Sequence, residues 1–266
     1  MITCNLKGGL GNMMFQIAGI KSFAKDNNTD VYFHNVREHL KVLDTIDKSP
    51  CRGYAKDYYT IFKNLNLGAN LQYNFTPKST VPCPFEYRPM SFVENICYDN
   101  FFQSEKFFVH NRDYILTMFE FSDEVKGIVD QIFNNKVGSG TTSALHIRRG
   151  DYLKYPNIHP TQALDYYTQA MKIIGADKYL VFSDDITWCK QWFVGEQFIF
   201  MEGHKDYIDM ALMQKCDHQI ICNSSFSWWA AWLNDNPNKK VIGPSKWFGD
   251  PNMNSSDVIP TNWIKI

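Results

Sequence analysis

Residues 144–152 place two adjacent arginines directly after an apolar segment. Residues 143–147 predict a short buried strand, and Gly150 lets the backbone turn where that strand ends. Polar side chains just beyond the carboxyl end of a strand lie where open α/β sheets bind ligands. Arg148 and Arg149 carry planar, permanent charges suited to a diphosphate. The segment therefore predicts a nucleotide site. A salt-bridged strand end is the alternative, because Arg–Asp pairs are common on surfaces.

His146 and Asp151 flank the arginines and can donate or accept hydrogen bonds. Two further polar clusters follow predicted strands: residues 183–185 (Ser-Asp-Asp) and residues 223–227 (Asn-Ser-Ser-Phe-Ser). Each cluster falls where a parallel sheet exposes the ends of its strands. Three such clusters in one half of the chain support a ligand site more strongly than any one of them.

The serines of the last cluster precede an apolar helix, where hydroxyls and free backbone amides can receive a phosphate. For Ser224 or Ser225 a plain N-cap is the alternative, but it does not account for the whole cluster with Ser227. Asp184 and Asp185 could hold a metal, act as acid or base, accept hydrogen bonds from a base or ribose, or cap a helix. A carboxylate can accept hydrogen bonds from the adjacent N–H groups of guanine. A metal is less supported, because there is no isolated Asp-x-Asp and the arginines supply positive charge.

A glycine-rich turn that contains Gly9 and Gly11 separates a predicted strand at residues 2–6 from a helix at about residues 13–25. A strand at residues 31–33 completes a βαβ unit, in which backbone amides can approach a ligand at the start of the helix. The turn lacks the third glycine of a dinucleotide fingerprint and the lysine of a P-loop. A tight turn without a ligand is therefore the alternative.

The second half of the chain alternates short apolar segments with helical patterns, which predicts a parallel, doubly wound α/β sheet. The predicted strands are residues 143–147, 179–182, 197–200, 218–221 and 241–242, and the predicted helices lie near residues 162–174, 186–192, 205–215 and 226–233. Residues 35–135 have poor periodicity and predict mixed helices and loops, with helical spacing at 119–133. Residues 134–140 resemble a linker. We therefore predict two domains, residues 1–138 and 139–266.

The overall composition excludes several classes of protein. Lys and Arg number 27 against 28 Asp and Glu, so bulk attraction to nucleic acid or to an anionic membrane is not expected. Seven scattered cysteines, an odd number without a Cys-x-x-Cys, favour a reducing compartment. The amino terminus lacks the pattern of a signal peptide, and no segment approaches the ~20 apolar residues of a membrane span. We expect a cytoplasmic, soluble protein.

Five segments, in chain order, resemble motifs of the bacterial α-1,2-fucosyltransferase family, the inverting glycosyltransferases of family 11. The arginine segment and the Asn-Ser-Ser-Phe-Ser-Trp-Trp segment are specific together, whereas the glycine turn alone is not. The sequence departs from the family pattern at Met13 and Ile17, where the family often carries glutamine and tyrosine. The departures affect the expected acceptor preference more than the class. The matching segments are residues 8–16, 102–108, 146–152, 182–185 and 223–230.

The resemblance implies a GT-B-like α/β fold, with two Rossmann-like domains facing a cleft. The C-terminal domain is expected to bind GDP-fucose, and the N-terminal domain is expected to lie on the acceptor side and bind a galactose-containing glycan. The resemblance implies no metal, no other cofactor and no nucleic acid. Kinship with enzymes of surface polysaccharide assembly allows a peripheral contact with the inner face of a membrane.

The resemblance also implies roles for single residues. Arg148 is expected to grip the β-phosphate of GDP, with Arg149 in support. His146 and one of Asp184 or Asp185 are expected to address the guanosine. The residues expected to close over the diphosphate are Ser224, Ser225 and Ser227, with the backbone amides of Gly9, Gly11 and Asn12.

The implied reaction moves L-fucose to the 2-hydroxyl of a galactoside with inversion. Negative charge grows on the β-phosphate as its bond to the sugar breaks, and arginine and amide donors stabilise that charge. No residue identifies itself as the base that takes the acceptor's proton, and Asp151 and Glu105 are the candidates. Three alternatives are a transferase for another GDP-sugar such as GDP-mannose, a non-catalytic glycan-binding protein, and a Rossmann oxidoreductase. The missing third glycine disfavours the last of these.

Overall fold

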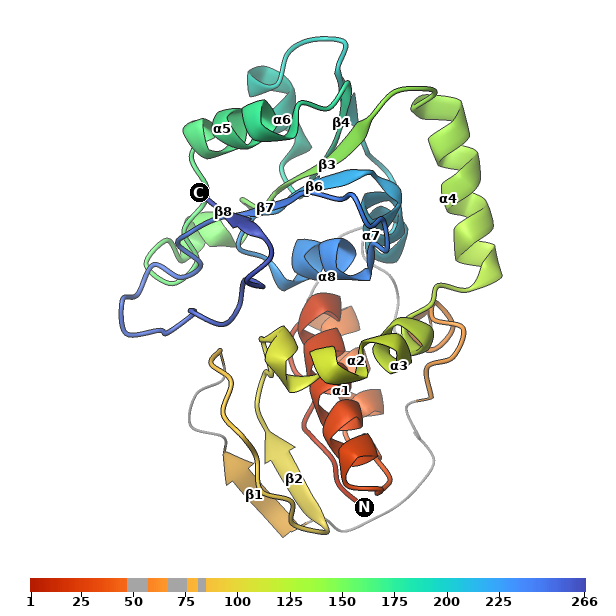
Figure 1. Ribbon diagram of the computed structural model, residues 1–266, viewed down its shortest axis with the longest axis vertical. Helices are drawn as coiled ribbons and strands as arrows, with labels where there is room; N and C mark the ends of the chain where they lie inside the picture. Colours follow the sequence, from red (N-terminus) through yellow and green to blue (C-terminus); the bar gives the residue numbers. More distant parts are fainter. Residues whose placement is uncertain (47–56, 67–75, 81–84) are drawn as a thin grey trace. The chain divides into compact units, whose positions relative to one another are not determined.

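The chain forms two compact units (Figure 1). The computed structural model describes residues 1–46, 57–66, 76–80 and 85–266. The N-terminal unit comprises residues 1–122 and 254–260, and the C-terminal unit comprises residues 123–253 and 261–266. Helix α4 (Asp123–Lys136) belongs to the C-terminal unit because it packs against α7 (Asp206–Lys215). The division between the units therefore precedes α4, whereas the linker pattern predicted a boundary after this helix.

The N-terminal unit begins with the predicted βαβ arrangement. Ile2 pairs in parallel with Val31, and Thr3 pairs in parallel with Cys97. The helix α1 (Leu10–Asp26) that follows the first of these segments is buried along most of its length. The βαβ prediction is thus confirmed, although the strands predicted on either side of α1 are reduced to single bridges.

The middle of the chain forms short elements, which explains its poor periodicity. Two short strands, β1 and β2, pair in parallel there, in a region where we had predicted only helices and loops. The helical spacing predicted at residues 119–133 overlaps most of α4, which begins four residues later. The elements are α2 (Val36–Ile46), η1 (Asp57–Tyr59), β1 (Thr76–Thr80), β2 (Ile96–Asp99), η2 (Glu105–Phe107), η3 (Val109–Asn111) and α3 (Arg112–Met118), where η marks a turn of 3₁₀ helix.

The C-terminal unit is built on a sheet of six strands in which every neighbouring pair is parallel. The strand order is β5–β4–β3–β6–β7–β8, so the direction of winding reverses between β3 and β6. Such a reversal is the switch point at which doubly wound sheets bind ligands, beyond the carboxyl ends of the strands. The predicted doubly wound sheet is confirmed. The strands are β3 (Thr142–Ile147), β4 (Lys178–Ser183), β5 (Phe198–Phe200), β6 (His218–Ile220), β7 (Val241–Gly243) and β8 (Ile264–Lys265).

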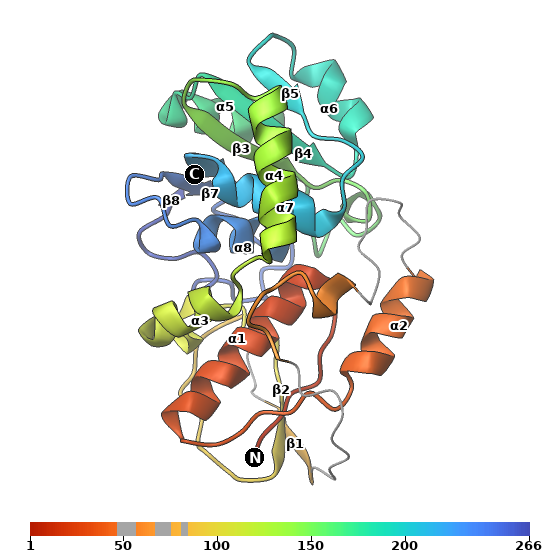
Figure 2. The ribbon, with the colours of Figure 1, turned by 90° about the vertical axis from the view of Figure 1, so that its right-hand side faces the viewer.

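Helices cover both faces of this sheet (Figures 1 and 2). α5 and α6 lie on one face, and α7 and α8 lie on the other. These helices are α5 (Leu164–Ile174), α6 (Ile186–Trp192), α7 and α8 (Ser225–Leu233), and a 3₁₀ turn, η4 (Tyr152–Lys154), follows β3. In the ranges that the structure describes, no helix has the length and apolar character needed to cross a membrane.

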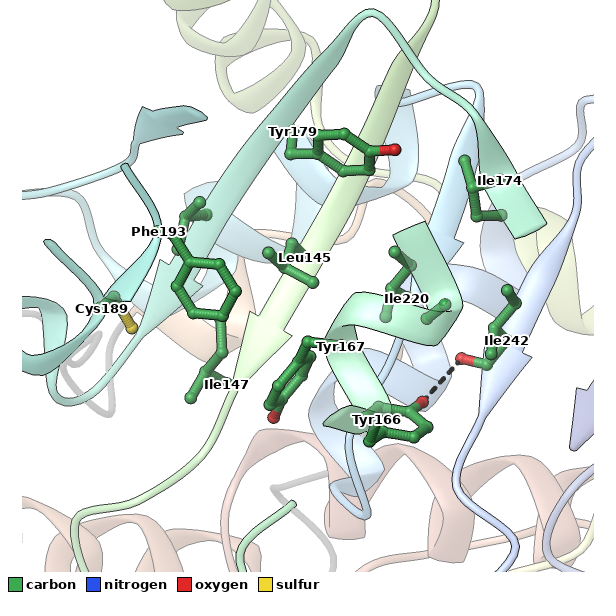
Figure 3. Packing of buried hydrophobic residues seen from close by; sticks show 12 residues of the cluster. Leu145, Ile147, Tyr166, Tyr167, Ile174, Tyr179, Cys189, Phe193, Ile220 and Ile242 are labelled. Atoms are coloured by element: carbon green, nitrogen blue, oxygen red, sulfur yellow. Dashed lines mark hydrogen bonds between the residues drawn. The ribbon is translucent and has the colours of Figure 1, made fainter. Parts of the chain in front are cut away.

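The core between the sheet and α5 shows why β3 reads as a continuous apolar segment (Figure 3). Side chains of a strand alternate between its two faces, so Leu145 and Ile147 point into this core while His146 points to the opposite face. Both faces are covered by helices, so every residue of β3 is buried. Tyr166 of α5 packs in the same core, and its hydroxyl donates a hydrogen bond to the carbonyl oxygen of Ile242 at 3.2 Å.

The three tryptophans of α8 are almost completely buried, as expected for packing residues. The rings of Trp228 and Trp232 stack with their centroids 6.2 Å apart, and Trp229 meets Trp228 edge-on at 5.1 Å. This aromatic cluster anchors α8. The N-terminus of the helix, which follows β6 closely, therefore has a fixed place beyond the carboxyl end of that strand.

Candidate ligand site at the switch point of the sheet

The carboxyl ends of β3 and β4 bring the predicted arginines and aspartates together. These strands pair in parallel with Ile147 opposite Ser183, so the residues that follow them are neighbours. Arg148 and Arg149 extend beyond the first strand, and the aspartates at 184–185 extend beyond the second. Four of the predicted site residues thus form one cluster of alternating charge.

Arg148 is held between two carboxylates. Its Nη2 lies 2.7 Å from Asp151 Oδ1, and its Nε lies 3.1 Å from Asp184 Oδ2. Burial acts to lower the pKa of Arg148, but the two carboxylates outweigh it and raise the pKa above its usual value. The two ion pairs fix the guanidinium in place. Because 38% of the side chain is exposed, it is still accessible to a ligand.

Arg149 is held at three points. Its backbone amide donates to Asp184 Oδ1 at 2.9 Å, and its Nε donates to Asp185 Oδ2 at 3.0 Å. Its guanidinium lies 4.0 Å from the centroid of the Trp188 ring, a distance at which the aromatic face stabilises a cation. Trp188 was not among the residues predicted from the sequence. The available signal was its position one helical turn after the aspartates.

The two aspartates have different roles in the structure. Asp185 is the N-cap of α6, where its carboxylate accepts a hydrogen bond from the backbone amide of Trp188 at 3.2 Å. Helix capping by one member of the pair is thus confirmed. Asp184 instead binds both arginine residues, and a Cβ on Gly150 would lie 2.5 Å from its Oδ2. The absence of a side chain at Gly150 therefore allows the Asp184 carboxylate to lie close to the backbone. A contact of either aspartate with guanine stays a prediction.

His146 is buried at the switch point between β3 and β6. Its Nδ1 lies 3.1 Å from Cys222 Sγ, and its ring centroid lies 5.6 Å from that of Phe226. Burial, with a smaller effect from the charge of Arg148, lowers the pKa of His146 to about 3. Burial raises the pKa of Cys222 to about 12. Both side chains are therefore neutral near pH 7, and their contact joins the ends of two strands. A contact of His146 with guanosine stays a prediction.

The serines after β6 form the N-terminus of α8. Ser224 is the N-cap, and its hydroxyl accepts a hydrogen bond from the backbone amide of Phe226 at 3.4 Å. Ser227 is buried and donates to the carbonyl oxygen of Ser224 at 3.3 Å, whereas Ser225 is half-buried. The N-cap alternative is confirmed for Ser224. The positive end of the helix dipole also favours a negative ligand at this place, although a diphosphate held by the serines stays a prediction.

A network that the sequence analysis missed ties the segment after β3 to the segment after β6. The Tyr152 hydroxyl donates to the carbonyl oxygen of Asn223 at 2.8 Å, and Gln162 Nε2 donates to Asn223 Oδ1 at 2.9 Å. Asn223 Nδ2 donates in turn to the carbonyl oxygens of Pro160 and Trp247, both at 3.0 Å. No local pattern could have revealed these contacts, because the partners are far apart in the chain.

The remaining predicted residues belong to the N-terminal unit. Gly9 is the N-cap of α1, and Gly11 is buried in the first turn of that helix. Asn12 Oδ1 accepts a hydrogen bond from Gln103 Nε2 at 2.8 Å. Glu105, one of the two candidate bases, begins η2. The expected roles of these residues in ligand binding stay predictions.

The positive charge of the site comes from Arg148, Arg149 and the start of α8. A ligand with two adjacent phosphates would match these groups in charge and in number of donors. In the described part of the chain, His, Cys, Asp and Glu side chains do not gather in groups of three or more that could hold a metal ion.

Sequence comparisons point to one family. The family model described as Glycosyl transferase family 11 matches residues 1–266. The chain is 28% identical over 308 residues to the O-antigen biosynthesis glycosyltransferase WbnK of Escherichia coli, with 100% of both chains covered. It is 29% identical over 296 residues to an alpha-1,2-colitosyltransferase of Escherichia coli, with 100% of this chain and 99% of the relative covered. It is 26% identical over 260 residues to galactoside 2-alpha-L-fucosyltransferase Sec1 of Mus musculus, with 88% of this chain and 64% of the relative covered.

The fold is similar to those of two solved fucosyltransferases. NodZ from Bradyrhizobium has a TM-score of 0.54 at 13% identity, with 86% of this chain and 90% of NodZ covered. POFUT1 in complex with GDP has a TM-score of 0.52 at 14% identity, with 91% of this chain and 97% of POFUT1 covered. Both neighbours are GT-B-like, and the expected GT-B-like α/β class is confirmed.

Proposed function

The chain belongs to glycosyltransferase family 11, and on this premise we propose that it moves L-fucose from GDP-fucose to the 2-hydroxyl of a galactoside in a surface glycan. The names of two relatives, an O-antigen biosynthesis glycosyltransferase and a galactoside fucosyltransferase, support the acceptor class and the sugar. We assign the GDP-sugar to the C-terminal unit, which holds both arginines, and the acceptor to the N-terminal unit.

One observation carries the proposal. Arg148 stands at the switch point of a doubly wound sheet, fixed by two carboxylates at 2.7 Å and 3.1 Å and still partly exposed. Guanidinium groups bind phosphates through two parallel hydrogen bonds, and fixing such a group before the ligand arrives lowers the entropy cost of binding. We infer that Arg148 grips the β-phosphate of the donor and that Arg149, stacked on Trp188, supports it.

The same arrangement can drive the transfer step. The bond between the sugar and the β-phosphate breaks through an oxocarbenium-like state, and negative charge grows on the departing phosphate. Arg148 and the amides at the start of α8 would stabilise that charge, so we propose that the reaction needs no metal. Removing one such donor typically costs about 3 kcal/mol, or roughly a hundredfold in rate.

The chain departs from the family pattern at two positions of the N-terminal unit. Met13 and Ile17 are both buried in α1. A glutamine or tyrosine at either position would need a buried hydrogen-bond partner, because an unpaired polar group in a core is costly. We infer that the two apolar residues change the packing of the N-terminal unit and, through it, the choice of acceptor.

A second candidate donor is GDP-colitose, because an alpha-1,2-colitosyltransferase is similar to this chain over its whole length. Colitose is fucose without its 3-hydroxyl group. A site that hydrogen-bonds this hydroxyl rejects the deoxy sugar by a large factor, whereas a site that packs against the position accepts it. Competition between the two donors therefore identifies the natural sugar.

The test is GDP release from GDP-fucose, GDP-colitose and GDP-mannose, with chelator present, with and without a panel of β-galactosides. We expect release that one galactoside stimulates, and a product that resists galactosidase until an α-1,2-fucosidase acts. Arg148→Ala should slow release by roughly a hundredfold, whereas Lys190→Ala should not, because that lysine pairs with Glu202 instead.

Each of the other outcomes points elsewhere. Release from GDP-mannose alone would indicate a transferase for another GDP-sugar. Saturable glycan binding without any affinity for GDP would indicate a non-catalytic glycan-binding protein. Activity that disappears in chelator and returns with a divalent ion would contradict the metal-independent reaction.

A further inference from the structure

His159 follows the arginine segment and packs against it. Its imidazole stacks on the ring of Tyr152, with centroids 4.9 Å apart and an angle of 20° between the planes, and the centroid of the Phe248 ring lies 6.0 Å away. Its backbone amide donates to the carbonyl oxygen of Tyr155 at 2.8 Å. The imidazole is therefore fixed by packing while it stays half-buried.

Tyr152 links His159 to the arginine that should hold the leaving group. The Arg148 guanidinium lies 5.7 Å from the centroid of the Tyr152 ring, and the Tyr152 hydroxyl is tied to the carbonyl oxygen of Asn223 at 2.8 Å. The tyrosine is thus held between two strand ends, with both side chains near its ring. The charge of Arg148 also acts on His159 and lowers its pKa.

The other titratable groups of this site are already engaged. Its three aspartates are paired with arginines, so protonating one of them would break an ion pair. His146 is buried against Cys222. The Tyr152 hydroxyl donates a hydrogen bond to the carbonyl oxygen of Asn223, and burial raises the pKa of Tyr152. Each of these groups is a poor acceptor for another proton.

His159 has the opposite character. Burial lowers the pKa of His159 below its usual value, and the charges of Asp151, which raises it, and Arg148, which lowers it, have smaller effects. These are the charged groups that act on the imidazole, and Tyr152 and Phe248 pack on it. The ring is therefore neutral near pH 7, with a lone pair on one nitrogen.

We propose that His159 is the proton acceptor of the transfer reaction, an inference that rests on the function proposed above. The acceptor hydroxyl oxygen bonds to the anomeric carbon as the bond from that carbon to the β-phosphate oxygen breaks. The hydroxyl proton passes to the imidazole nitrogen. The electron pair of the broken bond leaves with GDP, where Arg148 stabilises the charge, and the half-exposed imidazolium then returns the proton to water.

Two variants separate proton transfer from packing. His159→Gln keeps a polar side chain that cannot take the proton, and His159→Phe keeps a ring that can stack on Tyr152. We expect both variants to lower kcat by roughly a hundredfold, within the usual range for general-base catalysis. Their affinity for GDP should stay unchanged, which also shows that they fold.

The pH profile supplies a second readout. Wild-type kcat should fall as the pH drops through the pKa of His159, below the usual value of about 6.5, because imidazolium cannot accept a proton. Both variants should lack this acidic limb, and added imidazole should restore part of the rate of His159→Gln.

Three results would overturn the proposal. One is wild-type kcat in His159→Gln. Another is full activity in His159→Phe, which would limit the residue to packing. The third is a loss of GDP affinity equal to the loss of rate. Failure of the wild-type protein to use any GDP-sugar is a separate result that would contradict the proposed function itself.

Discussion

At Gly150 in the arginine segment, the side chain of Asp184 leaves no room for a Cβ. A Cβ there would lie 2.5 Å from Asp184 Oδ2 and 3.2 Å from Asp184 Cγ. Asp184 cannot rotate away without releasing the Arg148 side chain and the Arg149 amide. We expect Gly150→Ala to lower the free energy of unfolding by about 1–3 kcal/mol, the usual cost of overpacking. GDP binding should weaken roughly tenfold, or about 1.4 kcal/mol.

Urea denaturation and calorimetric titration with GDP measure these two effects separately. Asp184→Ala in the Gly150→Ala background is the matching control, because it removes the clash together with the contacts to both arginines and should not recover GDP binding. Wild-type GDP affinity in Gly150→Ala would show that Asp184 does not position the arginines.

His146 makes the stability of the C-terminal unit depend on pH. Its pKa is about 3 in the folded protein because the ring is buried, against about 6.5 for an unfolded chain. Between these two pKa values, the unfolded state binds a proton at His146 that the folded state does not. The contribution of His146 to stability is therefore full above pH 6.5 and is lost as the pH falls. The free energy of unfolding should drop by at most about 1.4 kcal/mol per pH unit from this group.

Urea denaturation between pH 7 and pH 5 tests the His146 prediction. We expect His146→Asn to be less stable than wild type at pH 7, because the contact with Cys222 is altered, and to show a shallower dependence on pH. An equal slope in the two proteins would mean that another group controls the loss.

At the scale of elements, α4 offers a change that should stabilise the fold without touching the site. Gly127 lies in the interior of this helix, and a Cβ there meets nothing within 4 Å. Glycine in a helix interior costs about 0.5–1 kcal/mol relative to alanine. Gly127→Ala should therefore raise the melting temperature by roughly 2–4 °C per kcal/mol gained, with kcat unchanged. A lower melting temperature would show that α4 is not a regular helix at this point.

The elements of the C-terminal unit could be predicted because strand and helix periods alternate there in short, regular lengths. The observed ends of these elements differ from the predicted ends by only a few residues. For example, α5 was predicted near 162–174 and is observed at Leu164–Ile174. β8 was missed, since it has two residues and both are exposed. In the N-terminal unit, the segments around α1 pair through single bridges, too short to show a period.

The candidate site was predictable where its chemistry is local. The two arginines, the aspartates and the serines follow strands directly, and parallel pairing brings the first two groups together. Trp188 and Cys222 were missed because their importance comes from tertiary contacts, and Asn223 was predicted only as part of the polar cluster at residues 223–227. The Trp188 ring stacks on the Arg149 guanidinium, and Cys222 contacts His146 at the switch point. The carbonyl oxygen of Asn223 accepts a hydrogen bond from the Tyr152 hydroxyl.

At the scale of the whole molecule, the two units differ in their tryptophan content, so that the unfolding of one unit can be followed separately. All seven tryptophans of the chain, at residues 188, 192, 228, 229, 232, 247 and 263, belong to the C-terminal unit. Tryptophan fluorescence therefore follows the unfolding of that unit alone, whereas far-UV circular dichroism follows both.

This difference allows the proposed location of the donor to be tested without turnover. A ligand that binds only the folded state stabilises it by about 2.7 kcal/mol at a concentration of 100 Kd. We expect GDP at that concentration to raise the midpoint of the fluorescence transition, and Arg148→Ala to show no rise at the same GDP concentration. If GDP binds but leaves the tryptophan transition unmoved while the circular dichroism transition shifts, the nucleotide is held by the N-terminal unit instead.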